Sequence, residues 1–289
     1  GWHITGTTGV FGAAAGAGKL IGLDNSQLTN ALGVAGTLSA GVREVFGTHG
    51  KPLHAGHAAE NGLRAAKWAQ VGFTGGNDII GGRRGFWAVA SRDGHSEEAL
   101  VGDFGKRWEL KMNGLKPFAN GIVSHPIQQA VIELRNEFSL KAEQVDSIKA
   151  RVHPLVLELM NRANPQVGLE GKFSFQHCAA AALIDGAGHD AQFSDEKVND
   201  PIISMVRSKV SASVDNAVAE DEVYLSINLL DGRKLEKHIK HATGSPTNPM
   251  TDEALNEKYH TLASDVLPQS QVAELASAVW GLDHSSDIS

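Results

Sequence analysis

Residues 222–240 have the sequence EVYLSINLLDGRKLEKHIK, which decides the fold class of the second half of the chain. In its first part, apolar residues alternate with polar ones, as in a strand with one buried face: Val223, Leu225, Ile227 and Leu229. Asp231 and Gly232 follow, a strong signal for a tight hairpin turn, and Leu235 and Ile239 lie in the returning segment. The stretch therefore predicts two antiparallel strands of a sheet.

The segments before this hairpin add a third strand and two helices. VDSIKARVH at 145–153 alternates imperfectly between apolar and polar residues, which indicates a strand. HPIQQAVIELRNEF at 125–138 has an apolar stripe at helical spacing and Pro126 in its first turn. FSFQHCAAAALIDG at 173–186 predicts a helix between the strands. We therefore expect a separate α+β domain over residues 109–245.

Residues 1–108 have a different texture, rich in Gly and Ala and poor in alternating β-branched residues. The segment 23–36 has Asp24 followed three residues later by Gln27, the pattern of a capping box at a helix start. The segment 55–73 places small and apolar residues at helical spacing: Ala59, Leu63, Ala66 and either Ala69 or Gln70. We expect a bundle of closely packed helices over 1–108.

The segment ATGSPTNPM at 242–250 is a polar, proline-rich connector that marks a boundary. Thr251 then precedes two acidic residues, a favourable helix start, and Pro268 begins a second helical pattern. We expect residues 246–289 to form helices that return to the helical domain. The predicted fold class is mainly α: an all-helical domain made of the N-terminal part and the C-terminal helices, with a smaller inserted α+β domain.

Composition excludes several classes of protein. Of 289 residues, 26 are Lys or Arg and 33 are Asp or Glu, giving a net charge of −7, so no basic field attracts nucleic acid or anionic lipid. No apolar run approaches the roughly 20 residues of a membrane span. The one cysteine, Cys178, lies among small apolar residues and indicates packing in a reducing, cytoplasmic compartment. The first residues carry no secretory signal pattern and resemble the interior of a folded segment, so we expect a fragment.

Two segments resemble cofactor-binding motifs, but each lacks residues that its motif requires. GAGKL at 16–20 lacks a phosphate-binding loop's first glycine, replaced by Ala13, and its hydroxyl residue, replaced by Leu20. The 13 histidines include His54 and His57 three residues apart, but no HExxH helix or carboxylate triad accompanies them. We expect neither a nucleotide nor a metal.

Polar groups instead gather in three glycine-flanked segments: GWHITGTTG at 1–9, FGTHGKPLHAGHAA at 46–59 and LKPFANGIVSHP at 115–126. Lysines and free backbone N–H groups at helix entrances suit carboxylate recognition. The alternative is that Lys51 and Lys116 are surface lysines and His3 caps a turn. The pattern alone leaves both open.

Six blocks, in chain order, resemble the MmgE/PrpD family over nearly all 289 residues: 1–24, 50–75, 79–86, 116–135, 173–186 and 244–259. The resemblance implies an all-helical domain, a smaller α+β lid and a homodimer. It also implies a small di- or tricarboxylate substrate, handled without metal or organic cofactor. The family includes 2-methylcitrate dehydratase, cis-aconitate decarboxylase and iminodisuccinate epimerase, and it has a further helical stretch before the block that begins this chain.

Carried over block by block, the resemblance assigns three catalytic residues: His3, Lys51 and Lys116. Secondary candidates for substrate binding come from the same segments: Thr5, His54, Asn120 and His125. We expect His3 to act as the base that removes a proton α to a carboxylate, and both lysines to hold carboxylates and stabilise negative charge. Lid closure would bring Lys116 to His3 and Lys51 in one cleft.

Two positions depart from the decarboxylase pattern. Asn120 stands where that enzyme has a histidine after the lid lysine, and Leu159 stands near the place of its catalytic tyrosine. We therefore expect a lyase similar to 2-methylcitrate dehydratase. The alternatives are an epimerase similar to iminodisuccinate epimerase, or a non-catalytic helical fragment that binds or assembles.

Overall fold

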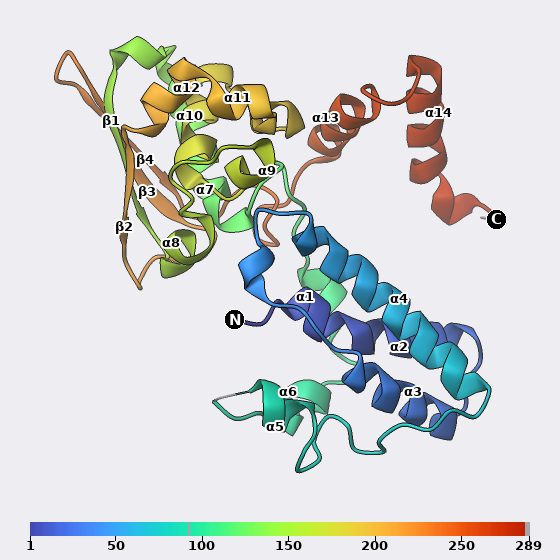
Figure 1. The fold of residues 1–289 in the computed structure, drawn as a ribbon. Coiled ribbons are helices and arrows are strands. Elements are labelled where there is room, and N and C mark those ends of the chain that lie inside the picture. The colour runs from blue at the N-terminus through green and yellow to red at the C-terminus, as the bar shows by residue number, and fades with distance from the viewer. Residues whose placement is uncertain (92, 287–289) are drawn as a thin grey trace. The chain divides into compact units, whose positions relative to one another are not determined.

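The computed structural model describes residues 1–91 and 93–286 (Figure 1). The chain divides into two compact units, Gly1–Arg107 and Trp108–Ser289, and each is described by itself. Among the described residues, no helix combines the length and apolar composition needed to cross a bilayer.

The first unit is helical, and its described residues include no strand. Its helices are α1 (Ile4–Thr7), α2 (Gly9–Leu20), α3 (Asn25–Thr37), α4 (Gly50–Gln70), α5 (Phe86–Ala90) and α6 (Glu97–Val101), with a 3₁₀ turn η1 (Arg43–Val45). Helices α2, α3 and α4 pack on one another around a small core: Val10, Ala14, Val34, Ala35, Ala58 and Ala65. Gly62 of α4 lies against Ala13 and the backbone of Ala14, and a methyl group there would collide with them. Small residues therefore set the close approach of these helices.

The capping box predicted for α3 is confirmed: the Asp24 carboxylate accepts from the Gln27 N–H, and the Gln27 side chain accepts from the Asp24 N–H. The predicted inward face of α4 is wrong in part. Ala59 and Leu63 are exposed, whereas a neighbouring stripe is buried: Ala58, Asn61, Gly62, Ala65, Ala66 and Ala69. In a helix with alanines on all sides, apolar spacing does not identify the face, and the glycine that permits contact decides it.

The second unit contains a four-stranded sheet in the order β2-β1-β3-β4. Its strands are β1 (Val145–Val152), β2 (Val210–Val214), β3 (Val223–Leu229) and β4 (Lys234–Ile239). The predicted hairpin is confirmed, with Ile227 opposite Leu235 and Gly232 in the left-handed region at φ 87°. Strand β1 is confirmed as well; it pairs antiparallel with β3 and parallel with β2.

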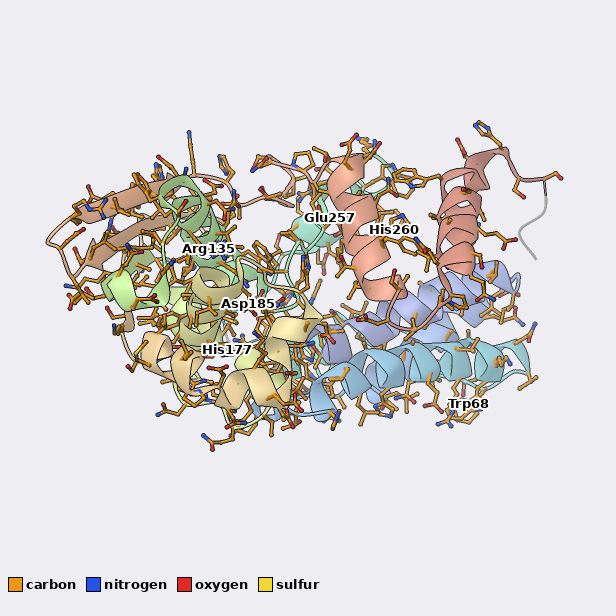
Figure 2. The ribbon with its side chains drawn as sticks, turned by 90° about the horizontal axis from the view of Figure 1, so that it is seen from above. Trp68, Arg135, His177, Asp185, Glu257 and His260 are labelled. Carbon is orange, nitrogen blue, oxygen red and sulfur yellow. The ribbon has the colours of Figure 1, made fainter. Side chains whose placement is uncertain are left out.

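Helices α7 (His125–Phe138), α10 (Phe175–Asp185) and α12 (Pro201–Arg207) cover one face of this sheet (Figure 1). The unit also contains shorter elements: η2 (Glu109–Met112), η3 (Ile122–Ser124), η4 (Ala142–Gln144), α8 (Pro154–Met160), α9 (Gly168–Gly171), η5 (Asp190–Phe193) and α11 (Asp195–Asn199). Arg135 of α7, labelled in Figure 2, donates from Nε to the carbonyl oxygen of Leu183 in α10 at 2.9 Å. Pro126 lies in the first turn of α7, as predicted.

The chain ends in α13 (Asp252–Ala263), α14 (Gln269–Trp280) and η6 (Leu282–His284). The Thr251 hydroxyl accepts from the Ala254 N–H at the start of α13, and Pro268 precedes α14. The α-rich fold with an α+β part is confirmed. The division into 1–108, 109–245 and 246–289, with the last segment returning to the helical domain, stays a prediction, and residues 287–289 lie outside the described part.

Candidate active site

His3 is held by its backbone at the start of α1. Its carbonyl oxygen accepts from the N–H groups of Gly6 and Thr7, at 2.9 and 3.1 Å, and from the Thr7 hydroxyl at 3.3 Å. Its own N–H donates to the carbonyl oxygen of Gly41 at 3.1 Å. The His3 backbone thus joins two segments of the first unit. These hydrogen bonds fix the backbone from which the half-buried His3 ring extends.

The His3 ring lies in a cluster with two side chains of α4, and α1 packs beside α4 (Figure 1). Its Nδ1 is 2.9 Å from Nδ1 of His54, and the edge of the Phe46 ring contacts it at a centroid distance of 5.0 Å. The Lys51 ammonium lies 5.4 Å from the centroid of the same Phe46 ring. Lys51 and His54 are three residues apart on α4, so one helix face presents both.

Burial lowers the pKa of His3, and the positive charge of Lys51 lowers it further, with smaller contributions from His54 and Arg43. An imidazole with a lowered pKa is neutral at physiological pH and can accept a proton. Thr5 is exposed on α1, so its assignment to substrate binding stays a prediction.

The second unit gathers the other predicted residues in the loop before α7. Lys116 donates from Nζ to the carbonyl oxygen of Asn120 at 3.0 Å, which closes the loop on itself. Lys258 of α13 donates from Nζ to the carbonyl oxygen of Lys116 at 2.7 Å. Helix α13 therefore anchors the loop that carries the predicted lid lysine.

Asn120 is buried, and its Nδ2 donates to Oε1 of Gln128 and to Sγ of Cys178, each at 2.7 Å. Three polar atoms around it are buried without a hydrogen-bond partner among the described residues: Asn120 Oδ1, His125 Nε2 and Gln128 Nε2. Buried polar groups are normally paired, so such a group of atoms indicates a place for water or a polar ligand.

His125 is 1% exposed, and its ring meets the Phe118 ring edge at 5.3 Å. Its pKa is lowered to about 3, mainly by burial and next by the positive charge of Lys116; a hydrogen bond with the Asn120 backbone opposes this, and Lys258 contributes least to the lowering. His125 is therefore a neutral hydrogen-bonding group at physiological pH.

Sequence reasoning missed two members of this cluster. Gln128 lies on the buried face of α7 beside Ile127 and Val131, and a polar residue among apolar ones on that face was the available signal. Lys258 gave no signal. The packing role of Cys178 is confirmed, because it is fully buried and burial raises its pKa to about 12.

The remaining motifs take ordinary structural places. Gly16 to Leu20 lie within α2 and form no phosphate-binding loop. Leu159 of α8 packs on the core of the second unit. Within residues 1–91 and 93–286, no group of three or more His, Cys, Asp or Glu side chains could hold a metal ion.

The structure thus brings His3, Lys51 and His54 together in the first unit, and Lys116, Asn120 and His125 together in the second. The convergence of the two sets in one cleft stays a prediction.

Comparison with known proteins identifies the family to which both parts of the chain are similar. Residues 1–99 match the model of the MmgE/PrpD N-terminal domain, and residues 118–284 match that of the MmgE/PrpD C-terminal domain. Cis-aconitate decarboxylases from Mus musculus and Homo sapiens are each 28% identical over the whole chain, and one from Aspergillus terreus is also 28% identical. The chain spans 61% of the length of the two mammalian relatives and 63% of the fungal one. Because the two family models together match most of the chain, and the predicted residues of each block cluster within their own unit, this protein belongs to the MmgE/PrpD family.

Proposed function

We propose that this chain is a cofactor-independent lyase that removes a proton α to a carboxylate of a small di- or tricarboxylate. The observation that carries the proposal is the cluster of His3, His54 and Lys51, in which a neutral imidazole lies near an ammonium group. A carbon acid needs a base, and the enediolate formed on proton loss needs nearby positive charge.

The residues divide the work as follows. His3 takes the α-proton, and Lys51 stabilises the negative charge that develops on the carboxylate oxygens. Lys116 holds a second carboxylate. His125, neutral and buried, donates or accepts a hydrogen bond at the position of its unpartnered Nε2. Asn120, whose Oδ1 is also unpartnered, offers a further acceptor.

For the overall reaction we propose dehydration, similar to that of 2-methylcitrate dehydratase. After His3 takes the proton, the C–H electron pair forms the new double bond and hydroxide leaves from the neighbouring carbon. Asn120 and Leu159 support this choice over decarboxylation, because they replace polar residues expected in the decarboxylase pattern. Leu159 packs on apolar neighbours, so it offers no hydroxyl to a substrate. Return of the proton to the opposite face would give an epimerase instead.

Decarboxylation is a second candidate, favoured by the printed names of the relatives, which are cis-aconitate decarboxylases. Loss of carbon dioxide also leaves an electron pair next to a carboxylate, so the same cations and the same histidine can serve it. The two reactions differ in what leaves the substrate and are separable by product analysis.

The experiment incubates the protein in deuterated solvent with citrate, 2-methylcitrate, cis-aconitate or an aspartate-derived imine. NMR spectra follow α-proton exchange and product formation, and bicarbonate release is measured in parallel. We expect exchange and water loss, reduced at least about 100-fold in His3→Asn. His57→Asn, on the exposed side of α4, is the control and leaves the rate unchanged. Bicarbonate release from cis-aconitate would establish the second candidate. A folded protein that neither exchanges nor converts any of these acids is the non-catalytic alternative.

A further inference from the structure

We propose that His54 is the positioning residue of His3 and relays a proton to and from it through the hydrogen bond between their Nδ1 atoms. The two nitrogens are 2.9 Å apart, although the residues are 51 positions apart in sequence. This role rests on the proposed function, in which His3 handles the substrate proton. It gives a task to a residue that the sequence suggested only as a substrate ligand.

The contact restricts the protons on both rings. Two imidazole nitrogens at hydrogen-bond distance need one proton between them, so one Nδ1 donates and the other accepts. When His3 donates, its Nε2 has a free lone pair and is a base. When His54 donates, His3 carries its proton on Nε2 and can give it up as its Nδ1 takes the proton from His54. The partner of a catalytic histidine commonly sets its tautomer in this way.

The relay balances the protons of a dehydration. His3 Nε2 takes the α-proton, and its Nδ1 proton passes to His54, so the positive charge moves one ring away from the substrate. His3 is then a neutral acid at Nε2. It gives that proton to the leaving hydroxide, forming water, while His54 returns a proton to His3 Nδ1. The pair ends in its starting arrangement.

The surroundings hold this pair in place. Gly41 packs on the His54 ring, and a methyl group on Gly41 would lie 3.0 Å from Nδ1. Gly41 has φ 127°, a conformation that favours glycine, and its carbonyl oxygen accepts from the His3 N–H. A methyl group on Gly6 of α1 would lie 3.3 Å from the His54 Cβ. Glycine backbone therefore lies close to His54 at two points, its ring and its Cβ.

The charged side chains around His3 also favour passing a proton on to His54. Lys51 and Arg43 both act on His3 as positive charges that disfavour its protonation. Passing a proton on to His54 removes the positive charge from the ring on which these cations act.

The test measures the tautomer of His3 directly, with long-range ¹H–¹⁵N correlation spectra of the imidazole nitrogens in the protein and in His54→Leu and His54→Asn. His57→Leu, one turn along α4, is the matched control because His57 bonds Asn61 and not His3. We expect His3 Nδ1 and Nε2 signals between those of pure N–H and pure lone-pair nitrogens. These signals change in His54→Leu and stay the same in His57→Leu.

Exchange kinetics give the second readout. With cis-aconitate, citrate or 2-methylcitrate as probe, His54→Leu should lower the α-proton exchange rate at least about tenfold and shift its pH profile, with KM little changed. His54→Asn keeps a hydrogen-bonding group near the same place, so it should restore part of the exchange but not full turnover.

The outcomes separate the two proposals. Identical His3 signals in the protein and in His54→Leu, with the helix intact by circular dichroism, overturn the relay. Equal loss of kcat in His54→Asn and His54→Leu, without a tautomer change, also overturns it. If the tautomer depends on His54 while no carboxylate is exchanged or converted, the pair stands and the proposed function fails.

Discussion

The lowered pKa of His125 makes the stability of this protein depend on pH in a defined window. The folded protein holds His125 neutral down to about pH 3, whereas the unfolded chain protonates it near its ordinary value of 6.5. Between these values the unfolded state binds more protons, so the free energy of unfolding falls as the pH falls. Above pH 6.5 His125 does not change the free energy of unfolding. Below pH 6.5 it lowers that free energy progressively, down to about pH 3.

The magnitude follows from the width of the window. Each pH unit below 6.5 removes about 1.4 kcal/mol, so lowering the pH from 7.5 to 4.5, which crosses two units of the window, removes about 2.7 kcal/mol through His125. The histidine is almost fully buried, so solvent screening does little to reduce this figure. Other buried groups add their own pH dependence, and a variant isolates this one.

The assay is urea unfolding at pH 7.5 and 4.5 for the protein and for His125→Gln, which removes the titration and keeps a polar side chain. We expect the loss of stability between the two pH values to be smaller by about 2.7 kcal/mol in His125→Gln. His260→Gln, an exposed position on α13, is the control and keeps the original pH dependence. An unchanged loss in His125→Gln would refute the inference that His125 is buried and neutral.

Three further predictions concern the same clusters. Lys51→Arg should lower kcat at least about tenfold in steady-state kinetics, with little change in thermal melting, because a planar guanidinium cannot occupy the point of a compact ammonium; a near-unchanged kcat would reduce Lys51 to general electrostatics. Asn120→Leu should lower the free energy of unfolding by about 1–3 kcal/mol in urea titrations, since it leaves Oε1 of Gln128 unpaired, whereas the exposed Asn164→Leu should not. Elemental analysis should find no stoichiometric metal, and a chelator should leave turnover unchanged; a metal whose removal abolishes activity contradicts this.

Local chemistry made part of the fold predictable from sequence. Asp231 and Gly232 specify their turn by backbone conformation alone, and the capping box of α3 involves only residues three positions apart. These features are decided within a few residues. The face of α4 is not, because the packing of Gly62 against α2 selects it, and the sequence of α4 contains no sign of its partner.

The candidate site was also predictable only in part. Its histidines and lysines are recognisable by type and by their glycine-flanked loops, but their pairing is a property of distant segments. His54 and Lys51 share a helix face, which sequence spacing shows. The contact of His54 with His3 through Nδ1 depends on Gly41, whose missing side chain leaves room for the His54 ring, and on Gly6, which leaves room for the His54 Cβ. Gly41 and Gly6 thus let backbone approach the imidazole that, in our proposal, sets the tautomer of His3.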